Sequence, residues 1–391
     1  MDNIHTNRLA EELLQQAVSR GASDLHIEPM ETGVRIRIRI DGLLEELTVL
    51  PIQQYSTLIT QFKVAGGMDI AEKRLPQDGR LVMYIEKQKI DLRLASIPTI
   101  NGEKLAVRIL SRQDNLLDLD TMSFSQKNLM QYRKLFQYTN GLLLLTGPTG
   151  SGKTTTLYAT LKEMDTSRHN IMTLEDPVEY KLNGINQVAV NNKTGLSFAA
   201  GLKAFVRQDP DIIMLGEIRD EETATMAVHA ALTGHLVLST LHTNNALGAV
   251  FRLLDMGIAD YLIAAALRGV LAQRLVRRLC THCRRQRLAS SAELAYLGCN
   301  NEDLLLWEAV GCEHCHGSGY KGRLAIQELM TFNKPLQKLL LSETNEEKMQ
   351  QQIYRQGENT LYHDAVEKLF AGETTVQELW RIGITAGGKD A

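Results

Sequence analysis

The chain lacks the features that mark membrane-spanning and secreted proteins. None of its apolar runs approaches the roughly 18 residues that a membrane-spanning helix needs. The longest, residues 261–276, contains Arg268 and Arg274, and we predict a buried helix there. The N-terminal sequence MDNIHTNRLAEELLQQ has no basic-then-apolar signal pattern. We therefore expect a cytoplasmic protein that contacts a membrane only through partners.

An excess of charge of one sign is also missing. The 43 Lys and Arg residues nearly balance the 46 Asp and Glu residues, which leaves a formal net charge of -3. This balance gives no indication of a nucleic-acid-binding protein or of a polybasic membrane anchor. The sequence has no internal repeat, no low-complexity tract and no aromatic stacking motif for nucleic acid. What remains is an ordinary globular composition, and 391 residues suggest two or three domains.

The first part of the chain has the pattern of a small α+β domain. An amphipathic helix is expected over about residues 7–20 and a second helix over 51–67. Around them lie segments typical of strands, separated by Gly, Pro and Asp turns: SDLHIEP, VRIRIRIDG, RLVMYIEKQKIDLRLASI and EKLAVRIL. We predict an N-terminal α+β domain over residues 1–111, followed by a polar linker over 112–123.

The pattern changes in residues 124–391, for which we predict a single larger domain. Short apolar strands alternate with helical stretches, in GLLLLTG, NIMTLED, DIIMLGE and HLVLSTLH. Strands separated by helices predict a parallel α/β sheet. After about residue 280 the sequence becomes polar and helical, and it contains two cysteine pairs. We predict a metal-binding module over 280–320 and a helical C-terminal part over 321–391.

The strongest motif predicts a phosphate-binding loop. Residues 147–154, GPTGSGKT, match the pattern G-x-x-x-x-G-K-[ST] between an apolar strand and a helix-forming stretch, a context that an ordinary glycine turn does not need. The glycines allow backbone N–H groups to surround phosphate oxygens at a helix N-terminus. Lys153 can reach the β and γ phosphates, and the Thr154 hydroxyl can hold Mg²⁺. The candidate ATP-binding residues are Gly147, Pro148, Thr149, Gly150, Ser151, Gly152, Lys153, Thr154 and Thr155.

Acidic residues and histidines follow the other predicted strands of this domain. Glu175 comes directly after one strand and Glu217 after another. A carboxylate at such a position can hold Mg²⁺ through water or orient the attacking water; the alternative is a loop or helix-cap residue. His235 and His242 flank the apolar segment 236–241, and the motif alone leaves both a structural and a functional role open.

Four of the five cysteines form two C-x-x-C pairs, Cys280 with Cys283 and Cys312 with Cys315. In a reducing compartment this spacing favours a metal over disulfides, and four thiolates suit a tetrahedral structural Zn²⁺. A redox pair or an iron–sulfur cluster is the alternative. Cys299 has no partner in the pattern. The nearby histidines could replace a cysteine ligand, but we do not expect them to do so; they are His282, His314 and His316.

Taken together, four motifs resemble those of the secretion-superfamily ATPases: GPTGSGKTTTLYATL, LEDPVEY, RQDPDIIMLGEIRD and LTGHLVLSTLHTN. The closest resemblance is to the GspE/PilB branch, the ATPases of type II secretion and type IV pilus assembly, and it extends over nearly the whole chain. It implies a P-loop NTPase (RecA-like) domain, a smaller PAS-like N-terminal domain, and a hexameric ring. The tetracysteine insert is typical of this assembly branch and not of the retraction branch. Family members commonly have a further N-terminal docking domain, which we expect this chain to lack.

The resemblance also implies roles for individual residues. Lys153 and Thr154 would bind phosphate and Mg²⁺, and Glu217 would be the Walker B glutamate. The full set of implied catalytic residues is Glu175, Arg207, Glu217, Arg219, His235 and His242. Arg93 and Arg108 of the N-terminal domain would reach the nucleotide across the gap between the domains.

The strand Gly33–Gly42 carries Arg35, Arg37 and Arg39 on one face and only aliphatic side chains on the other. One interpretation is a solvated face whose arginines pair with acids of the neighbouring strands, in IEP and EKQK. In the other, these arginines border the nucleotide cleft, where developing phosphate charge needs positive partners.

The sequence thus predicts an ATP-hydrolysing motor for pseudopilus or pilus assembly, with ATP, Mg²⁺ and Zn²⁺ as cofactors. The partners implied by the resemblance are further copies of the chain in a homohexamer, an inner-membrane platform protein and a docking protein on its cytoplasmic face. We expect a peripheral location at the inner membrane and no direct contact with nucleic acid. The alternatives are a regulatory ATP-binding switch that hydrolyses little ATP, and a DNA-translocating ring ATPase.

Overall fold

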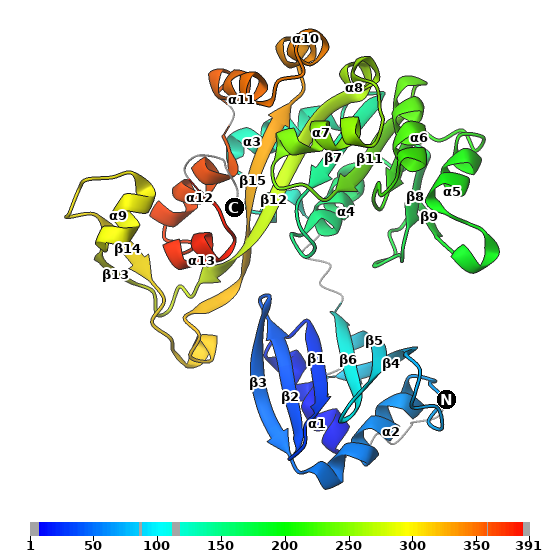
Figure 1. Cartoon of the computed structure of the whole chain (residues 1–391), viewed down its shortest axis with the longest axis vertical. Coiled ribbons are helices and arrows are strands. Elements are labelled where there is room, and N and C mark those ends of the chain that lie inside the picture. Colours follow the sequence, from blue (N-terminus) through cyan, green and yellow to red (C-terminus); the bar gives the residue numbers. More distant parts are fainter. Residues whose placement is uncertain (1–7, 86–87, 112–117, 358, 386–391) are drawn as a thin grey trace. The chain divides into compact units, whose positions relative to one another are not determined.

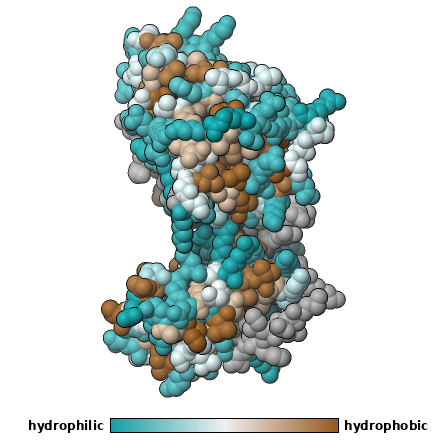
Figure 2. Space-filling model, turned by 90° about the vertical axis from the view of Figure 1, so that its right-hand side faces the viewer, coloured by the Kyte–Doolittle hydropathy of each residue, from teal (hydrophilic) through white to brown (hydrophobic). Residues whose placement is uncertain are grey.

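A computed structural model of the chain describes residues 8–85, 88–111, 118–357 and 359–385. It divides into two compact units, Met1–Gln113 and Asp114–Ala391. No helix within the described ranges is long and apolar enough to cross a membrane. On the face drawn in Figure 2, exposed hydrophobic side chains are interspersed among hydrophilic ones.

The described part of the N-terminal unit is an antiparallel sheet with two helices (Figure 1). The strands are β1 (Asp24–Pro29), β2 (Val34–Ile40), β3 (Leu43–Leu50), β4 (Gln77–Ile85), β5 (Gln88–Thr99) and β6 (Gly102–Ser111), in the spatial order β3-β2-β1-β6-β5-β4. The helices are α1 (Arg8–Ser19) and α2 (Tyr55–Ala65), preceded by a short turn η1 (Ile52–Gln54). The apolar side chains of both helices share one core with those of the strands, so the helices cover one face of the sheet.

Strand β2 has the two faces that its sequence predicts. Val34, Ile36 and Ile38 are fully buried in the core, while the arginines between them lie on the face that the helices leave open. The predicted strand is therefore confirmed, and its arginines belong to the open face of the sheet.

The described part of the C-terminal unit contains a seven-stranded sheet in the order β15-β12-β7-β11-β10-β8-β9. All neighbouring strands are parallel except β12 and β15. The strands are β7 (Gly141–Thr146), β8 (Ile171–Glu175), β9 (Asn186–Ala189), β10 (Ile212–Leu215), β11 (Leu236–Leu241), β12 (Leu267–Leu279) and β15 (Tyr320–Thr331). This arrangement confirms the predicted parallel α/β sheet.

Helices pack on both faces of this sheet because its central strands carry apolar side chains on both faces. In β7, Leu143 and Leu145 belong to one core with α3 (Gln126–Leu135) and α4 (Lys153–Glu163), whereas Leu142 and Leu144 belong to the other. The second core also contains residues of α5 (Phe198–Phe205), α6 (Glu221–Leu232), α7 (Ala246–Asp255) and α8 (Asp260–Ala266). A short turn, η4 (Asn192–Thr194), precedes α5.

The predicted linker is not free of structure over its whole length. Residues 112–117 lie outside the described residues, but the turn η3 (Leu119–Thr121) follows them. Leu119 is buried in the core beneath α3 and α4, so this end of the segment folds with the C-terminal unit.

Two expectations about secondary structure are wrong. The helix predicted over 261–276 ends with α8 at Ala266, and the chain continues as the strand β12. The helical part predicted from residue 321 begins instead with the strand β15. These two long strands pair with each other, and β12 also pairs with β7, so long-range sheet pairing overrides a local pattern that fits a buried helix.

Beyond the sheet, β12 and β15 extend side by side towards the cysteine module (Figure 1). The module contains a two-stranded sheet of β13 (Arg285–Leu288) and β14 (Leu305–Glu308), with α9 (Ser291–Leu297) between them and the turn η5 (Glu313–Cys315) after them. After β15 the chain is helical as predicted, with α10 (Lys334–Ser342), α11 (Glu346–Arg355), α12 (Leu361–Phe370) and α13 (Val376–Arg381).

Candidate functional site

The predicted phosphate loop connects the buried strand β7 to the N-terminus of α4, which begins at Lys153. Gly147, Gly150 and Gly152 have φ angles of 147°, 80° and 88°, which a residue with a side chain rarely adopts. The loop between Pro148 and Gly150 is exposed, and so is the Thr154 side chain in the first helical turn. The glycines thus give the loop its shape, and the positive end of α4 faces the space around it.

Lys153 lies folded against this loop. Its Nζ donates to the carbonyl oxygens of Gly147 at 2.7 Å and of Pro148 at 3.1 Å. The side chain is buried, and burial lowers the pKa of Lys153 to about 8; Glu217 opposes this change and Arg274 adds to it. A bound phosphate would offer the ammonium group a negative partner in place of two carbonyl dipoles.

Glu217 lies at the same edge of the sheet, just beyond the end of β10. Arg219 Nη2 donates to Glu217 Oε1 at 2.5 Å, and His242 Nε2 is 3.4 Å from Glu217 Oε2. The hydrogen bond from Arg219 lowers the pKa of Glu217, with His242 contributing, although burial opposes it. Glu217 is therefore an anion at neutral pH, beside Lys153 and His242.

The structure places Glu175 differently from the sequence expectation of a residue available to water or metal. Its side chain is buried and accepts three hydrogen bonds, from the Tyr158 hydroxyl, from Thr173 Oγ1 at 2.5 Å and from Gln187 Nε2 at 3.1 Å. Tyr158 belongs to α4, so this carboxylate connects the helix after the phosphate loop to β8 and to the start of β9. Its oxygens are occupied by the chain's own donors.

The two predicted histidines do not share one site within a single chain. His242 follows β11 at the edge of the sheet where the phosphate loop lies, since Leu241 pairs with Thr146 at the end of β7. His235 precedes β11 at the opposite edge, where its Nδ1 lies 2.9 Å from the Ala230 carbonyl oxygen. The six residues of β11 lie between them, so their Cα atoms are about 23 Å apart.

Arg207 is also remote from the phosphate loop. It is exposed after the end of α5 and before the start of β10, at the same edge of the sheet as His235. Of the predicted catalytic residues, the structure therefore brings together Glu217, Arg219 and His242 beside Lys153.

The N-terminal arginines lie on the open face of their own sheet. Arg93 and Arg108 are directly opposite each other on β5 and β6, and Arg108 Nε lies 3.2 Å from Asp24 Oδ1. The two candidates are therefore neighbours, although a place beside the nucleotide remains a prediction.

The three arginines of β2 have acidic partners on β1. Glu28 accepts hydrogen bonds from Arg35 and Arg37, and Arg39 lies 3.8 Å from Asp24. Burial raises the pKa of Glu28, but hydrogen bonds from Arg37 and from a neighbouring lysine lower this pKa to about 2. Pairing with the acid of IEP is thus present, whereas the glutamate of EKQK lies outside the described residues.

Two important residues were missed by the sequence analysis because they lie on β12, where a helix was predicted. Gln273 Nε2 donates to the Ser151 carbonyl oxygen at 2.7 Å, and Gln273 Oε1 accepts from Thr156 Oγ1 at 2.9 Å. Arg274, the next residue, donates from Nη2 to the Asn244 carbonyl oxygen at 2.6 Å. Only the register of β12 on β7, which pairs residue 272 with residue 146, reveals these contacts.

The four cysteines of the two C-x-x-C pairs come together as predicted. Their sulfur atoms lie within 4.8 Å of one another, with separations of 3.9 Å for Cys280 to Cys312, 3.8 Å for Cys283 to Cys315 and 3.7 Å for Cys312 to Cys315. A disulfide requires about 2.05 Å between sulfurs. A tetrahedron of thiolates at about 2.3 Å from Zn²⁺ has edges of about 3.8 Å. The cluster therefore has the dimensions of a tetrahedral metal site.

The surroundings of one sulfur, that of Cys315, also fit a metal. The backbone N–H groups of Cys312 and Gly319 point at Cys315 Sγ, each at 3.2 Å, and they lower the pKa of the Cys315 thiol although burial opposes them. The thiolate is the form that binds metal. The rings of His282 and His314 lie tilted against each other with centroids 4.0 Å apart, and they are not members of the cluster found in the described residues.

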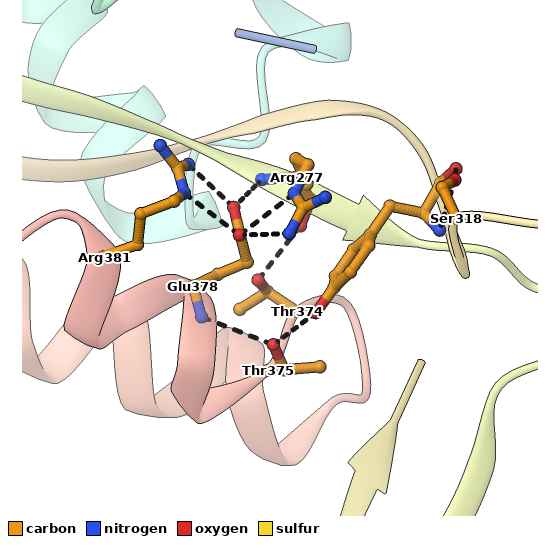
Figure 3. A network of polar contacts seen from close by, with 7 residues as sticks. Arg277, Ser318, Thr374, Thr375, Glu378 and Arg381 are labelled. Atoms are coloured by element: carbon orange, nitrogen blue, oxygen red, sulfur yellow. Dashed lines mark hydrogen bonds and ion pairs between the residues drawn. The ribbon is translucent and has the colours of Figure 1, made fainter. Parts of the chain in front are cut away.

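A polar network fastens the base of this module to α13 (Figure 3). Glu378 is 1% exposed and accepts from Arg277 on β12 and from Arg381 on its own helix. The guanidinium of Arg277 also lies 3.9 Å from the ring centroid of Tyr320, whose hydroxyl is 2.8 Å from Thr375 Oγ1. The long strands β12 and β15, which lead to and from the cysteine module, are therefore tied to α13.

Comparisons with known proteins give matches over nearly the whole chain. A family model described as "Type II/IV secretion system protein" matches residues 2–381. The type II secretion system ATPase E of Vibrio cholerae is 44% identical over 382 residues, which cover 97% of this chain and 76% of that protein. The type IV pilus assembly ATPase PilB of Thermus thermophilus is 42% identical over 382 residues, covering 97% of this chain and 43% of that protein.

Solved structures share the fold at lower sequence identity. The ATPase DotB of Legionella pneumophila has a TM-score of 0.70 at 22% identity, with 96% of this chain and 95% of DotB covered. The pilus retraction motor PilT, with bound ADP, has a TM-score of 0.64 at 24% identity, with 96% of this chain and 97% of PilT covered. At this level of identity the likeness concerns the fold, and it confirms the predicted α/β fold class.

Proposed function

The chain belongs to the Type II/IV secretion system protein family and is an ATPase, and from this membership we propose that it is the motor of a type II secretion pseudopilus or a type IV pilus. The observation that carries the proposal is the group at one edge of the sheet. There the phosphate loop with Lys153, Glu217 and His242 converge, supplied by the connections after the parallel strands β7, β10 and β11. Such a group suits attack of water on the γ-phosphate of ATP.

In this mechanism the backbone N–H groups of residues 147–152 surround the β and γ phosphates, and Lys153 leaves its carbonyl partners to bind them. The exposed Thr154 hydroxyl would be the protein ligand of Mg²⁺, which would neutralise charge on the transferred phosphate. Glu217, kept ionised by Arg219, orients the attacking water and accepts its proton. His242 connects this carboxylate to the end of β11.

The remaining parts of the proposal concern assembly and location. We propose a homohexamer in which Arg93 and Arg108 complete the nucleotide site, and in which domain motion is passed to an inner-membrane platform protein. The chain would act at the cytoplasmic side of that membrane. The four cysteines would hold one structural Zn²⁺, a proposal supported by the sulfur separations.

The first test is ATP hydrolysis and ADP binding by the wild type, Lys153→Ala and Glu217→Gln. Lys153→Ala is expected to lose hydrolysis and to bind ADP much more weakly, because the phosphates lose their buried cation. Glu217→Gln should keep ADP binding but hydrolyse ATP about 100-fold to 10,000-fold more slowly, since it loses the base and keeps the shape. Binding without any hydrolysis that depends on Lys153 and Glu217 would favour a regulatory switch instead, and stimulation by DNA would favour a nucleic-acid motor.

A further inference from the structure

The side-chain amide of Gln273 contacts residues on both sides of the junction between the phosphate loop and α4. Its Nε2 donates to the Ser151 carbonyl oxygen, and its Oε1 accepts from the Thr156 hydroxyl. Ser151 and Thr156 flank the two residues proposed to hold phosphate and Mg²⁺, Lys153 and Thr154. Gln273 is 3% exposed, so neither contact can be replaced by bulk water.

This contact solves a problem that the loop itself creates. A phosphate loop turns its N–H groups towards the anion, so some of its carbonyl groups must face the protein interior. A buried carbonyl without a donor is costly. Gln273 provides that donor for the Ser151 carbonyl oxygen.

The loop glycines give an independent indication of how closely Gln273 approaches. A Cβ atom added to Gly147 would lie 2.3 Å from the Gln273 carbonyl oxygen, and one added to Gly152 would lie 2.6 Å from its Nε2. Both positions therefore need glycine for space as well as for their positive φ angles. The loop thus packs against the backbone of residue 273 at Gly147 and against the Gln273 side chain at Gly152.

From these contacts we propose that Gln273 is a positioning residue for the nucleotide phosphates, a role that rests on the proposed ATPase site. By holding Ser151 and Thr156, it keeps the N–H groups between them aimed at the anion before nucleotide arrives. Such pre-organisation lowers the cost of binding. The residue lies more than 100 positions after the loop, on β12, and it thus links the phosphate site to the strand pair β12–β15.

The test measures the ADP dissociation constant of Gln273→Leu, with Gln327→Leu as the matched control. Gln327 is the direct neighbour of Gln273 on β15 and is fully buried, but its Nε2 lies 3.5 Å from the Met122 carbonyl oxygen and not at the loop. We expect Gln273→Leu to bind ADP about tenfold to a hundredfold more weakly, because the buried Ser151 carbonyl oxygen loses its donor and the Thr156 hydroxyl keeps only the Gly152 carbonyl oxygen as acceptor. Gln327→Leu should bind ADP as the wild type does, whatever its melting temperature.

A charge variant gives a readout that a merely structural role would not change. In Gln273→Glu, an ionised carboxylate would face the Ser151 carbonyl oxygen, whereas the protonated form can still donate to it. Its ADP affinity should therefore recover as the pH is lowered, relative to the wild type at each pH. A Gln273→Glu affinity that follows the wild type at every pH would contradict the proposal.

A further pair of variants, at position 156, keeps the test valid if substitutions at position 273 prevent folding. Thr156→Ser keeps the hydroxyl, whose acceptors are Gln273 Oε1 at 2.9 Å and the Gly152 carbonyl oxygen at 3.2 Å, and Thr156→Val removes it. Only Thr156→Val should weaken ADP binding. Wild-type affinity in Gln273→Leu or Thr156→Val would overturn the role of Gln273 alone, while a wild-type chain that binds no ADP would overturn the proposed ATPase site itself.

Discussion

At the residue scale, Lys153 is an ammonium group that the nucleotide-free fold stabilises poorly. Two carbonyl oxygens are its hydrogen-bond partners, and burial lowers its pKa to about 8, against an ordinary lysine value of about 10.4. A bound diphosphate is negative and favours the protonated form, so it must raise this pKa again. Nucleotide binding above about pH 8 should therefore take up a proton.

The prediction is that ADP affinity falls as the pH rises above about 8, by at most about tenfold per pH unit. The affinity falls because, in this pH range, Lys153 of the free protein loses the proton that it keeps in the complex. Titration calorimetry in buffers of different ionisation enthalpy would measure the proton uptake directly. Lys153→Ala should bind weakly and show no such uptake in this range; equal proton uptake by wild type and variant would assign the titration to another group.

At the element scale, the features that sequence could predict are those written in one continuous stretch. The strand β7 with its glycine loop and the arginine strand β2 were predicted correctly because neighbouring residues determine them. The cysteine cluster was predicted because a metal site has few possible ligand spacings. By contrast, β12 is a strand because β7 and β15 lie on either side of it, and those partners are distant in sequence. Because β12 was not predicted as a strand, the contacts of Gln273 and Arg274 were not predicted either.

The cysteine module is the element whose stability should depend on metal. It has a two-stranded sheet and one short helix, too little to form a large core, and its base is tied to α13 through Glu378. We expect elemental analysis to find one zinc per chain. Chelation should raise hydrogen exchange in residues 280–320 and, through Arg277 and Glu378, in α13 as well.

Cys283→Ser should reproduce the effect of chelation, because it removes one of the four sulfurs. The matched control is Cys299→Ser, since the Cys299 sulfur accepts from the Asn301 N–H group at 3.5 Å and is not part of the cluster. The zinc proposal would be contradicted if the protein contained no metal and its hydrogen exchange were the same with and without chelator. Bound iron would indicate an iron–sulfur cluster instead of zinc.

At the scale of the whole molecule, the proposed site draws on residues from both compact units. Lys153 and Glu217 belong to the C-terminal unit, whereas Arg93 and Arg108 lie on the open sheet face of the N-terminal unit. Those arginines can act on nucleotide only if an N-terminal unit meets a phosphate loop, either within one chain or between neighbours in a ring. The two arrangements differ in how activity depends on other chains.

Mixtures of two inactive variants separate these arrangements. If neighbours complete each site, a Lys153→Ala chain can lend its arginines to the intact phosphate loop of an Arg93→Ala/Arg108→Ala chain. Mixing the two should then restore part of the ATPase activity, and the wild-type rate per chain should rise with protein concentration as rings form. If each chain completes its own site, no mixture contains an intact site and activity stays absent. We expect restoration, because a motor that passes motion around a ring must couple each nucleotide to a neighbouring subunit. A rate per chain that is constant across concentrations where sizing detects only monomers would contradict the ring.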